Sequence, residues 1–215
     1  MDRDTLILVP TAVEARTLDA RGWRYELCGF GVVAAAARTA AVIAARRPQR
    51  VMLVGVAGTY RPEVLPVGAA ASFAEVAIDG IGAGEGAGLV GPDALGLPQW
   101  PANGDRPAVV DRLAVGFGGD GDEREAGALL LTACAAAASA QQARARCRRH
   151  PAVLAEDMEG FAVALAARLA SVPVAVVRGV SNVAGDRDHR RWRVGEAMAA
   201  ACDRAAAVLD GTAAP

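Results

Sequence analysis

The sequence predicts an α/β fold, in which a single domain has three layers (αβα) around a central mixed, largely parallel sheet. Two observations predict it. Short apolar runs alternate with longer alanine-rich stretches along the 215 residues. The apolar runs are continuous rather than alternating, which is typical of strands covered by helices on both faces. No internal repeat or low-complexity linker divides the chain, so we expect residues 1–215 to form one domain.

The first quarter of the chain predicts three strands and two helices. Leu6 to Val9 form an apolar run that ends at Pro10. Thr11 then has Glu14 three residues later, which is the spacing of a capping box at a helix start. We expect strands over 6–9, 25–30 and 51–54, and helices over 11–19 and 32–46.

The rest of the chain continues the alternation after a weakly patterned middle. Residues 80–125 are rich in Gly, Pro and Asp, so we expect loops there with at most one helix. Strands are expected over 129–131, 153–154 and 172–177, a polar loop over 180–192, and helices over 135–149, 160–169 and 194–209.

Composition excludes several function classes. The net charge is −1 and the pI is about 6.1, so nothing favours binding of nucleic-acid phosphates. All 23 basic residues are arginine, which excludes Schiff-base lysine chemistry. The first apolar run is too short for a signal peptide, and no run has the length of a membrane span. We therefore expect a cytoplasmic protein with no nucleic-acid or membrane partner.

The cysteines and histidines give no metal site. Cys28, Cys134, Cys147 and Cys202 form no C-x-x-C pair, and the sequence has only two histidines. A structural zinc site needs a tighter ligand cluster. We expect the cysteines to be reduced and mostly buried, and we expect no metal or organic cofactor.

Candidate site residues follow the predicted strands, because ligands of such sheets bind at the carboxyl ends of the strands. Glu14 fits both a helix cap and a catalytic carboxylate. Gly29 and Gly31 resemble a dinucleotide fingerprint only superficially, because the third glycine is missing. The glycine-rich segment 55–58 follows the third strand.

Two further clusters carry chemistry. Glu156, Asp157 and Glu159 precede an apolar helix. Carboxylates at a helix start are favoured by the helix dipole alone, but a helix buried on all sides makes a functional role more plausible. Asn182 follows the next strand, where an amide offers both a donor and an acceptor, although a simple turn residue also fits. The charged stretch 186–192 fits a solvated loop equally well.

Together these motifs resemble the nucleoside phosphorylase and hydrolase superfamily. The similarity is carried by Thr11-Ala-Val-Glu14, Cys28-Gly-Phe-Gly31, Gly55-Val-Ala-Gly58, Asp157-Met-Glu-Gly160 and Arg178-Gly-Val-Ser-Asn182, in that order. It spans about residues 5 to 209. The segments around Asp157 and Asn182, with Trp192, are most similar to the futalosine hydrolase branch of the menaquinone pathway.

The resemblance implies roles for individual residues. Glu14 would activate the attacking water, Glu159 would hold the ribose hydroxyls, and Met158 would pack on the sugar. Asn182 would contact the purine. The other residues implied in substrate binding are Asp157, Gly55, Ala57, Gly58, Phe161, Ser181 and Asp186.

Asn182 predicts which base leaves. A 6-oxopurine presents an acceptor at C6, which suits the Asn NH₂ group, whereas a 6-aminopurine presents a donor there. A site built for one pattern leaves buried groups unpaired with the other. This favours hypoxanthine, as in futalosine, over adenine. The proton for the leaving base would come from water or from Asp186.

The sequence departs from the superfamily at several positions. Asp157 stands where a glutamate is usual, and segment 132–136 lacks the usual base-stacking aromatic, so stacking would fall to Phe161 or to a neighbouring subunit. Residues 80–105 differ most and would set the 5′ substituent. The carboxylate of futalosine would suit Arg61 or Arg187.

Other readings of the motifs stay open. A purine nucleoside phosphorylase, a methylthioadenosine-type nucleosidase and a catalytically silent nucleoside-binding protein fit the same fold. We expect a small-molecule nucleoside substrate and a homo-oligomer.

Overall fold

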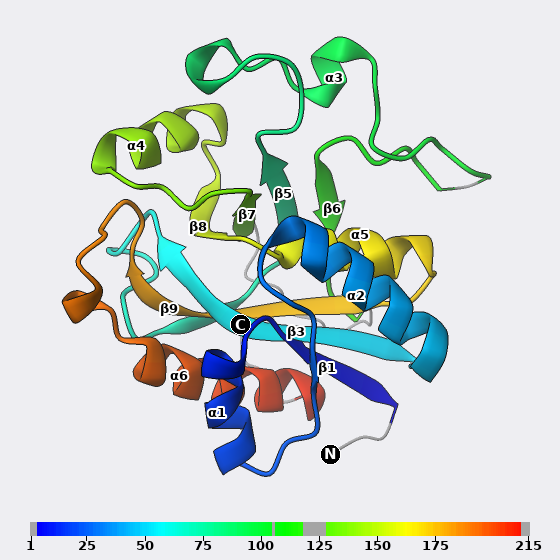
Figure 1. Cartoon of the computed structure of the whole chain (residues 1–215), viewed down its shortest axis with the longest axis vertical. Helices are drawn as coiled ribbons and strands as arrows, with labels where there is room; N and C mark the ends of the chain where they lie inside the picture. The colour runs from blue at the N-terminus through cyan, green and yellow to red at the C-terminus, as the bar shows by residue number, and fades with distance from the viewer. Residues whose placement is uncertain (1–3, 105, 118–127, 212–215) are drawn as a thin grey trace.

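The computed structural model describes residues 4–104, 106–117 and 128–211. Figure 1 shows its strands in one twisted sheet with helices on both sides. The strands are β1 Thr5–Val9, β2 Glu26–Leu27, β3 Arg50–Thr59, β4 Ala70–Ser72, β5 Glu75–Asp79, β6 Arg112–Ala114, β7 Leu129–Ala133, β8 Val153–Asp157 and β9 Val174–Val183. The helices are α1 Ala12–Ala20, α2 Gly31–Arg46, α3 Pro92–Leu95, α4 Ala140–Arg149, α5 Gly160–Leu169 and α6 Val194–Leu209, with 3-10 turns at Gly86–Gly88 and His189–Arg191.

The sheet is mixed and largely parallel, which confirms the predicted fold class. Its order is β2-β1-β3-β8-β7-β5-β6, and β9 pairs with β3 and β4. Within the described residues, five strand pairs are parallel and three are antiparallel. Apolar side chains of α2 and α5 pack on one face, and those of α1 and α6 pack on the other.

Strand β3 is the centre of the sheet and organises the site. One of its edges pairs with β9, while the other pairs first with β1 and then, at its end, with β8. Gly58 therefore has Glu156 of β8 on one side and Asn182 of β9 on the other. The β3–β9 register shifts by one residue at Ser181, which is a β-bulge. Bulges re-aim side chains beside active sites, and this one brings Asn182 opposite Gly58.

Most predicted elements are confirmed, and α5 and α6 begin and end at the predicted residues. The predicted position of two motifs past their strands is wrong. Segments 55–58 and 178–182 lie inside β3 and β9, because the two strands stay paired to their ends. The predicted second strand is also shorter than expected, since only Glu26–Leu27 pair with β1.

The start of α4 is a further correction. The helix begins at Ala140, with Ser139 as its N-cap, and not at Ala135. The four alanines 135–138 instead form a loop beside β8. Strands β4, β5 and β6 were not predicted. Glu75–Asp79 nevertheless form a buried strand next to β7, as parallel pairing requires.

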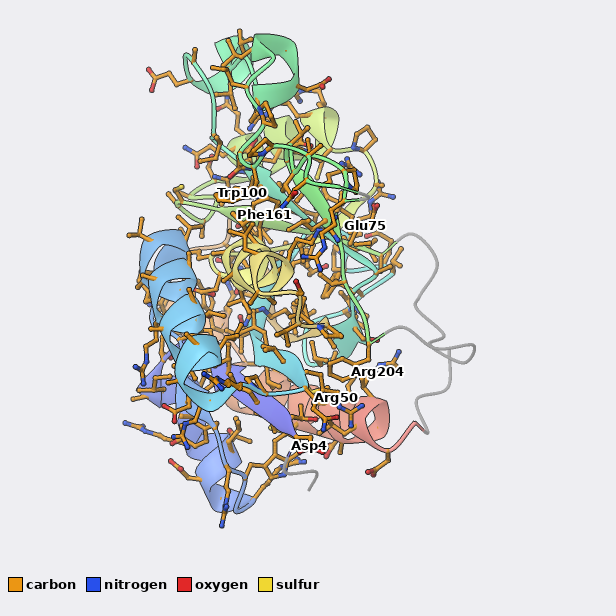
Figure 2. The ribbon with its side chains drawn as sticks, turned by 90° about the vertical axis from the view of Figure 1, so that its right-hand side faces the viewer. Asp4, Arg50, Glu75, Trp100, Phe161 and Arg204 are labelled. Atoms are coloured by element: carbon orange, nitrogen blue, oxygen red, sulfur yellow. The ribbon has the colours of Figure 1, made fainter. Side chains whose placement is uncertain are left out.

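The middle segment lies at the far edge of the sheet. Figure 1 shows α3 and its flanking turns beyond β5 and β6, and Figure 2 shows Trp100 in the same region. No helix of the described residues has the length and apolarity to cross a membrane. Two cysteines, Cys28 and Cys202, are buried as expected, but Cys134 is exposed and Cys147 is partly exposed.

The close packing of β9 against α6 leaves no room for a side chain at Gly179. A Cβ at this position would overlap the backbone carbonyl of Ala197 in α6. We expect Gly179→Ala to lower the free energy of unfolding by about 3 kcal/mol, because rigid backbone must move. Urea unfolding measures this change. The control is Gly195→Ala within α6, where a Cβ meets nothing and alanine is the better helix former. Equal stability of the two variants would contradict the constraint.

Candidate active site

A cavity of about 580 Å³ lies where β1, β3, β8 and β9 converge, and it collects most of the predicted site residues. Its polar wall comes from three chain segments that are distant in sequence but adjacent in the sheet. Glu14 in the first turn of α1 and Glu159 at the N-cap of α5 are part of this wall. The cavity is lined by residues that include Thr11, Glu14, Glu156, Met158, Glu159 and Asn182.

Glu14 is fixed at the start of α1 and is largely buried. Its Oε2 accepts a hydrogen bond from the Thr11 hydroxyl at 2.6 Å, and its Oε1 accepts one from the Val56 backbone N–H at 3.0 Å. Thr11 also caps the helix by accepting from the Glu14 backbone N–H. The predicted cap is therefore present, and the carboxylate itself turns toward β3 and the cavity.

Arg178 of β9 is completely buried and holds two further carboxylates. Its Nε and Nη2 donate to Asp157 Oδ2 at 3.0 and 2.5 Å, and Nη2 also lies 3.4 Å from Glu159 Oε2. Gly55 makes this possible, because a Cβ there would overlap the Arg178 guanidinium and lie 2.9 Å from Glu14 Oε1. Arg178 Nη1 has no hydrogen-bond partner among the described residues. This buried nitrogen lies near Glu14 Oε1, since both atoms are next to the position that a Cβ on Gly55 would take.

Glu159 lies opposite Glu14 at the start of α5. Its Oε1 accepts a hydrogen bond from the Gly31 backbone N–H at 2.9 Å. Burial raises the pKa of the Glu159 carboxyl to about 7; the Arg178 guanidinium opposes the rise, and the Asp157 carboxylate adds to it. A carboxylate whose ionisation is penalised by burial is a typical functional group of an enzyme site.

Asn182 supplies the polar group at the other end of the cavity. Ser181 Oγ donates to Asn182 Oδ1 at 2.7 Å and lies 3.3 Å from the Ala57 carbonyl oxygen. This contact orients the amide, so that Nδ2 is turned away from Ser181. One N–H of Nδ2 donates to the Val183 carbonyl at 2.9 Å, and the NH₂ group has a second hydrogen to donate. A Cβ on Gly58 would come within 3.3 Å of the same nitrogen. The missing side chain of Gly58 therefore leaves room for a flat group beside Asn182.

The loop after β9 closes one side of the cavity. Arg187, His189 and Trp192 line it. The Arg187 guanidinium stacks over the Trp192 ring at 5.1 Å, and the His189 and Trp192 rings are 4.4 Å apart. The charged stretch is therefore partly a site wall and not only a solvated loop.

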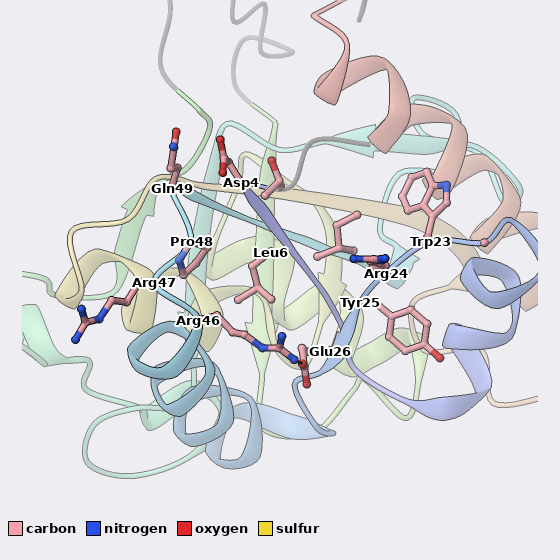
Figure 3. Close-up of a pocket in the computed structure, with 13 residues that line it drawn as sticks. Asp4, Leu6, Trp23, Arg24, Tyr25, Glu26, Arg46, Arg47, Pro48 and Gln49 are labelled. Atoms are coloured by element: carbon pink, nitrogen blue, oxygen red, sulfur yellow. Dashed lines mark hydrogen bonds and ion pairs between the residues drawn. The ribbon is translucent and has the colours of Figure 1, made fainter.

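A second cavity, of about 990 Å³, lies at the amino end of β1 (Figure 3). It lies between β1, β2 and the C-terminal end of α2. Arg46 in its wall pairs with Glu26. The cavity contains none of the predicted site residues, so the smaller cavity is the candidate active site.

Comparisons with known proteins identify the family of this chain. A family model described as "Phosphorylase superfamily" matches residues 127–214. Futalosine hydrolase of Thermus thermophilus is 33% identical over 214 residues, covering 91% of this chain and 90% of that one. Futalosine hydrolase of Streptomyces coelicolor is 58% identical over 55 residues, which are 26% of this chain and 23% of that one.

This chain belongs to the futalosine hydrolase family. As a member of that family it is an N-glycosyl hydrolase that acts on a nucleoside.

Solved structures share the fold of this futalosine hydrolase family member. A methylthioadenosine/S-adenosylhomocysteine nucleosidase of Colwellia psychrerythraea, in complex with adenine, has a TM-score of 0.75 at 20% identity and covers 97% of this chain and 95% of that one. Futalosine hydrolase of Helicobacter pylori has a TM-score of 0.73 at 14% identity, with coverages of 96% and 97%.

The structure brings most of the predicted site residues of this futalosine hydrolase family member to the cavity wall. These are Glu14, Ala57, Gly58, Asp157, Met158, Glu159, Ser181 and Asn182. Asp157 needs a correction, however, because its oxygens are taken by Arg178, by the Thr132 hydroxyl at 2.6 Å and by the Gly160 backbone N–H at 2.7 Å. Asp157 supports Arg178 instead of facing a ligand. Gly55 likewise acts by making room for Arg178.

Two predicted ligand contacts are wrong. Phe161 is 1% exposed and packs in the main core, so it is not placed to stack on a base. Figure 2 shows it within the body of the protein. Asp186 accepts hydrogen bonds from the Asp188 backbone N–H and from Arg191, so it stabilises its own loop. It is not part of the cavity wall, which removes it as the expected proton source.

Sequence reasoning missed the contacts of Arg178 and the position of Glu156 in the cavity wall. Arg178 was seen only as part of a motif, although an arginine directly after four apolar strand residues is itself a signal of a buried cation. Glu156 was seen only as one of three acidic residues. The alternation of side chains along β8 does not show which face of the strand borders the cavity, so it does not reveal that the Glu156 side chain reaches it.

The raised pKa of Glu159 predicts a pH-dependent change in stability. Between its ordinary value of 4.5 and about 7, the folded state binds more protons than the unfolded state, so stability falls as the pH rises through this window. Glu159→Gln removes this loss. We expect the melting temperature of the variant relative to the wild type to be higher at pH 8 than at pH 5, by about 3 °C or more.

Thermal unfolding followed by circular dichroism measures the difference. Exposed Glu63→Gln is the control and should show no comparable change between the two pH values. A Glu159→Gln effect of the same size at pH 5 and pH 8 would contradict the assignment.

Proposed function

We propose that the protein hydrolyses the N-glycosidic bond of futalosine, releasing hypoxanthine and dehypoxanthine futalosine in menaquinone formation. One observation carries the proposal. The carboxylates of Glu14 and Glu159 meet beside a fully buried Arg178 at one end of a cavity whose other end presents the amide of Asn182. The full-length similarity to the Thermus enzyme supports the same substrate.

Glu14 acts on the attacking water. A water molecule bound in the cavity next to the Glu14 carboxylate gives one of its protons to that carboxylate. The oxygen then bonds to C1′ of the ribose while the bond from C1′ to the base nitrogen breaks. The hydrogen bonds from Thr11 and Val56 hold the carboxylate in place for this step. A positioned base of this kind contributes about 10² to 10⁴ in rate.

Glu159 holds the sugar. Its ionised carboxylate accepts hydrogen bonds from the ribose hydroxyls and stabilises the positive charge that grows at C1′. The Gly31 backbone N–H fixes one oxygen, and Met158 packs beside the ring. Asp157 and Arg178 keep Glu159 in this orientation.

Asn182 receives the base. Since Ser181 donates to the amide oxygen, the amide nitrogen faces the base and donates to the 6-oxo group as negative charge moves onto the purine. The leaving base takes its proton from water, because Asp186 lies away from the cavity wall.

Arg187 binds the carboxylate at the 5′ end of the substrate. It lines the cavity, whereas Arg61 donates to the Pro151 carbonyl and lies away from it. Its guanidinium stacks on Trp192, which keeps the group in place and leaves its edge for a carboxylate. Homo-oligomer formation stays a prediction; the exposed apolar side chains of Val13, Phe30 and Val33 near the cavity would suit a second copy.

Base release in phosphate-free buffer tests the reaction. The purified protein is incubated with futalosine, inosine and methylthioadenosine in parallel, and the bases are separated by chromatography. We expect hypoxanthine from futalosine. Adenine release would favour a methylthioadenosine-type nucleosidase, dependence on added phosphate would favour a phosphorylase, and no release would favour a silent binder.

Glu14→Gln tests the water step. The amide keeps the size of the side chain and can still bind Val56 and Thr11, so the fold should be preserved. We expect kcat for futalosine to fall about a thousandfold, because the amide accepts no proton. Near-normal turnover with an unchanged melting temperature would reduce Glu14 to a helix cap.

Arg187→Gln tests the 5′ end. We expect kcat/KM for futalosine to fall about tenfold to a hundredfold, because a charge-assisted hydrogen bond is lost, while kcat/KM for inosine changes little. Arg61→Gln is the matched control and should leave both substrates unaffected. An equal loss for futalosine and inosine would show that Arg187 does not read the carboxylate.

A further inference from the structure

The wall of the cavity opposite Asn182 is made almost entirely of alanine. Ala135, Ala136 and Ala138 line it, and their side chains offer no hydrogen bond. The one ionisable side chain on this wall, within the described residues, is Glu156 of β8. The proposed mechanism leaves this buried carboxylate without a role.

Strand register places Glu156 and Asn182 in one row. Gly58 of β3 pairs with Glu156 on one edge and with Asn182 on the other. Adjacent strands are about 4.8 Å apart, so the two residues are about 10 Å apart across the glycine. Paired residues direct their side chains to the same face. The arrangement is a slot with Gly58 as its floor, an acceptor at one end and a donor amide at the other.

Glu156 is held firmly in this position. Its Oε2 accepts from the Tyr60 hydroxyl at 2.5 Å and from Arg146 Nη1 at 2.6 Å, and its Oε1 accepts from the Ala137 backbone N–H at 2.8 Å. Arg146 also donates to the Ala135 carbonyl and lies 3.3 Å from Asp79. Burial, and then the Glu156 charge, raise the pKa of Tyr60, so Tyr60 remains a donor.

The contacts of Glu156 leave one acceptor position. A carboxylate oxygen has two lone pairs, and Oε1 has a single hydrogen-bond donor among the described residues. An ionised carboxylate can only accept, so its natural partner in the slot is an N–H on the base.

We propose that Glu156 is a specificity-determining residue, which accepts a hydrogen bond from N1–H of a 6-oxopurine while Asn182 donates to the neighbouring 6-oxo oxygen from the side of N7. The inference rests on the proposed function, since it identifies which class of base that site releases. Adenine has a lone pair at N1, which would face the carboxylate and leave it unpaired. Hypoxanthine and guanine both carry N1–H, so the residue selects 6-oxopurines as a class.

Equilibrium binding of free bases tests this without turnover. Calorimetry with hypoxanthine, adenine and 1-methylhypoxanthine gives the affinity of the wild type and of Glu156→Gln. We expect the wild type to bind 1-methylhypoxanthine at least about tenfold more weakly than hypoxanthine, because the N1–H is gone. We expect the hypoxanthine-to-adenine affinity ratio to fall at least about tenfold in Glu156→Gln, because an amide can also donate to N1 of adenine.

Tyr60→Phe is the matched control. It removes a hydrogen bond from the same carboxylate but leaves the acceptor in the slot, so the affinity ratio should stay within about threefold. A purely structural Glu156 would lower the affinities for hypoxanthine and adenine equally in Glu156→Gln, and that result would overturn the proposal. The comparison of hypoxanthine with 1-methylhypoxanthine needs only the wild type. It therefore tests the hydrogen bond from N1–H even if a variant fails to fold.

The two proposals can fail separately. If futalosine is not hydrolysed but the base preference depends on Glu156, the hydrolase proposal fails and the base-reading role stands. If futalosine is hydrolysed and 1-methylhypoxanthine binds as well as hypoxanthine, the base-reading role alone is overturned.

Discussion

The buried Arg178 guanidinium is the interaction on which the sugar end of the site depends. It is fully enclosed, and it neutralises Asp157 and Glu159, which are buried beside it. Removing one partner of a buried ion pair leaves an uncompensated charge, which typically costs about 3 to 5 kcal/mol. The same cation lowers the cost of keeping Glu159 ionised, and it stands next to Glu14. Stability and chemistry therefore share one side chain.

This guanidinium also explains why small residues recur around it. Gly55 has no Cβ because the guanidinium occupies that space, and Gly160 lies against the Asp157 carboxylate. Gly55 and Gly160 thus make room for the protein's own charged groups, whereas Gly58 opens space beside Asn182. In the motif Gly55-Val-Ala-Gly58, the first glycine therefore makes room for Arg178 and the last makes room beside Asn182.

Local patterns were sufficient for α5 and α6, but not for the ends of β3 and β9 or for the start of α4. α5 and α6 could be placed residue by residue because apolar periodicity, a preceding polar segment and a following break all agree. Strands β4 to β6 were missed because a strand of three to five residues is defined by the strands it pairs with and not by its own pattern. Likewise the bulge at Ser181, which aims Asn182, depends on pairing with β3.

Cavity-lining residues could be predicted where the residue type itself is informative. They could not be predicted where only the contacts in the folded chain identify them. Glu14, Glu159 and Asn182 could be found because carboxylates and amides after strands are conspicuous. The support from Arg178 and the cavity exposure of Glu156 both require the sheet order, which joins β8 and β9 across β3. Phe161 was misplaced for the same reason, since an aromatic next to a motif can face either the cavity or the core.

Charge balance across the cavity links its two ends. In the proposed mechanism, Glu14 and Glu159 lie on either side of the position where positive charge grows on the sugar, which favours the transition state. Negative charge grows on the base, so an uncompensated carboxylate there would oppose departure. Glu156 avoids this because Arg146 pairs with it at 2.6 Å and Tyr60 donates to it. The neutral amide of Asn182 adds a donor without adding charge. On the proposed mechanism, the base end therefore serves recognition, while the sugar end supplies the electrostatic catalysis.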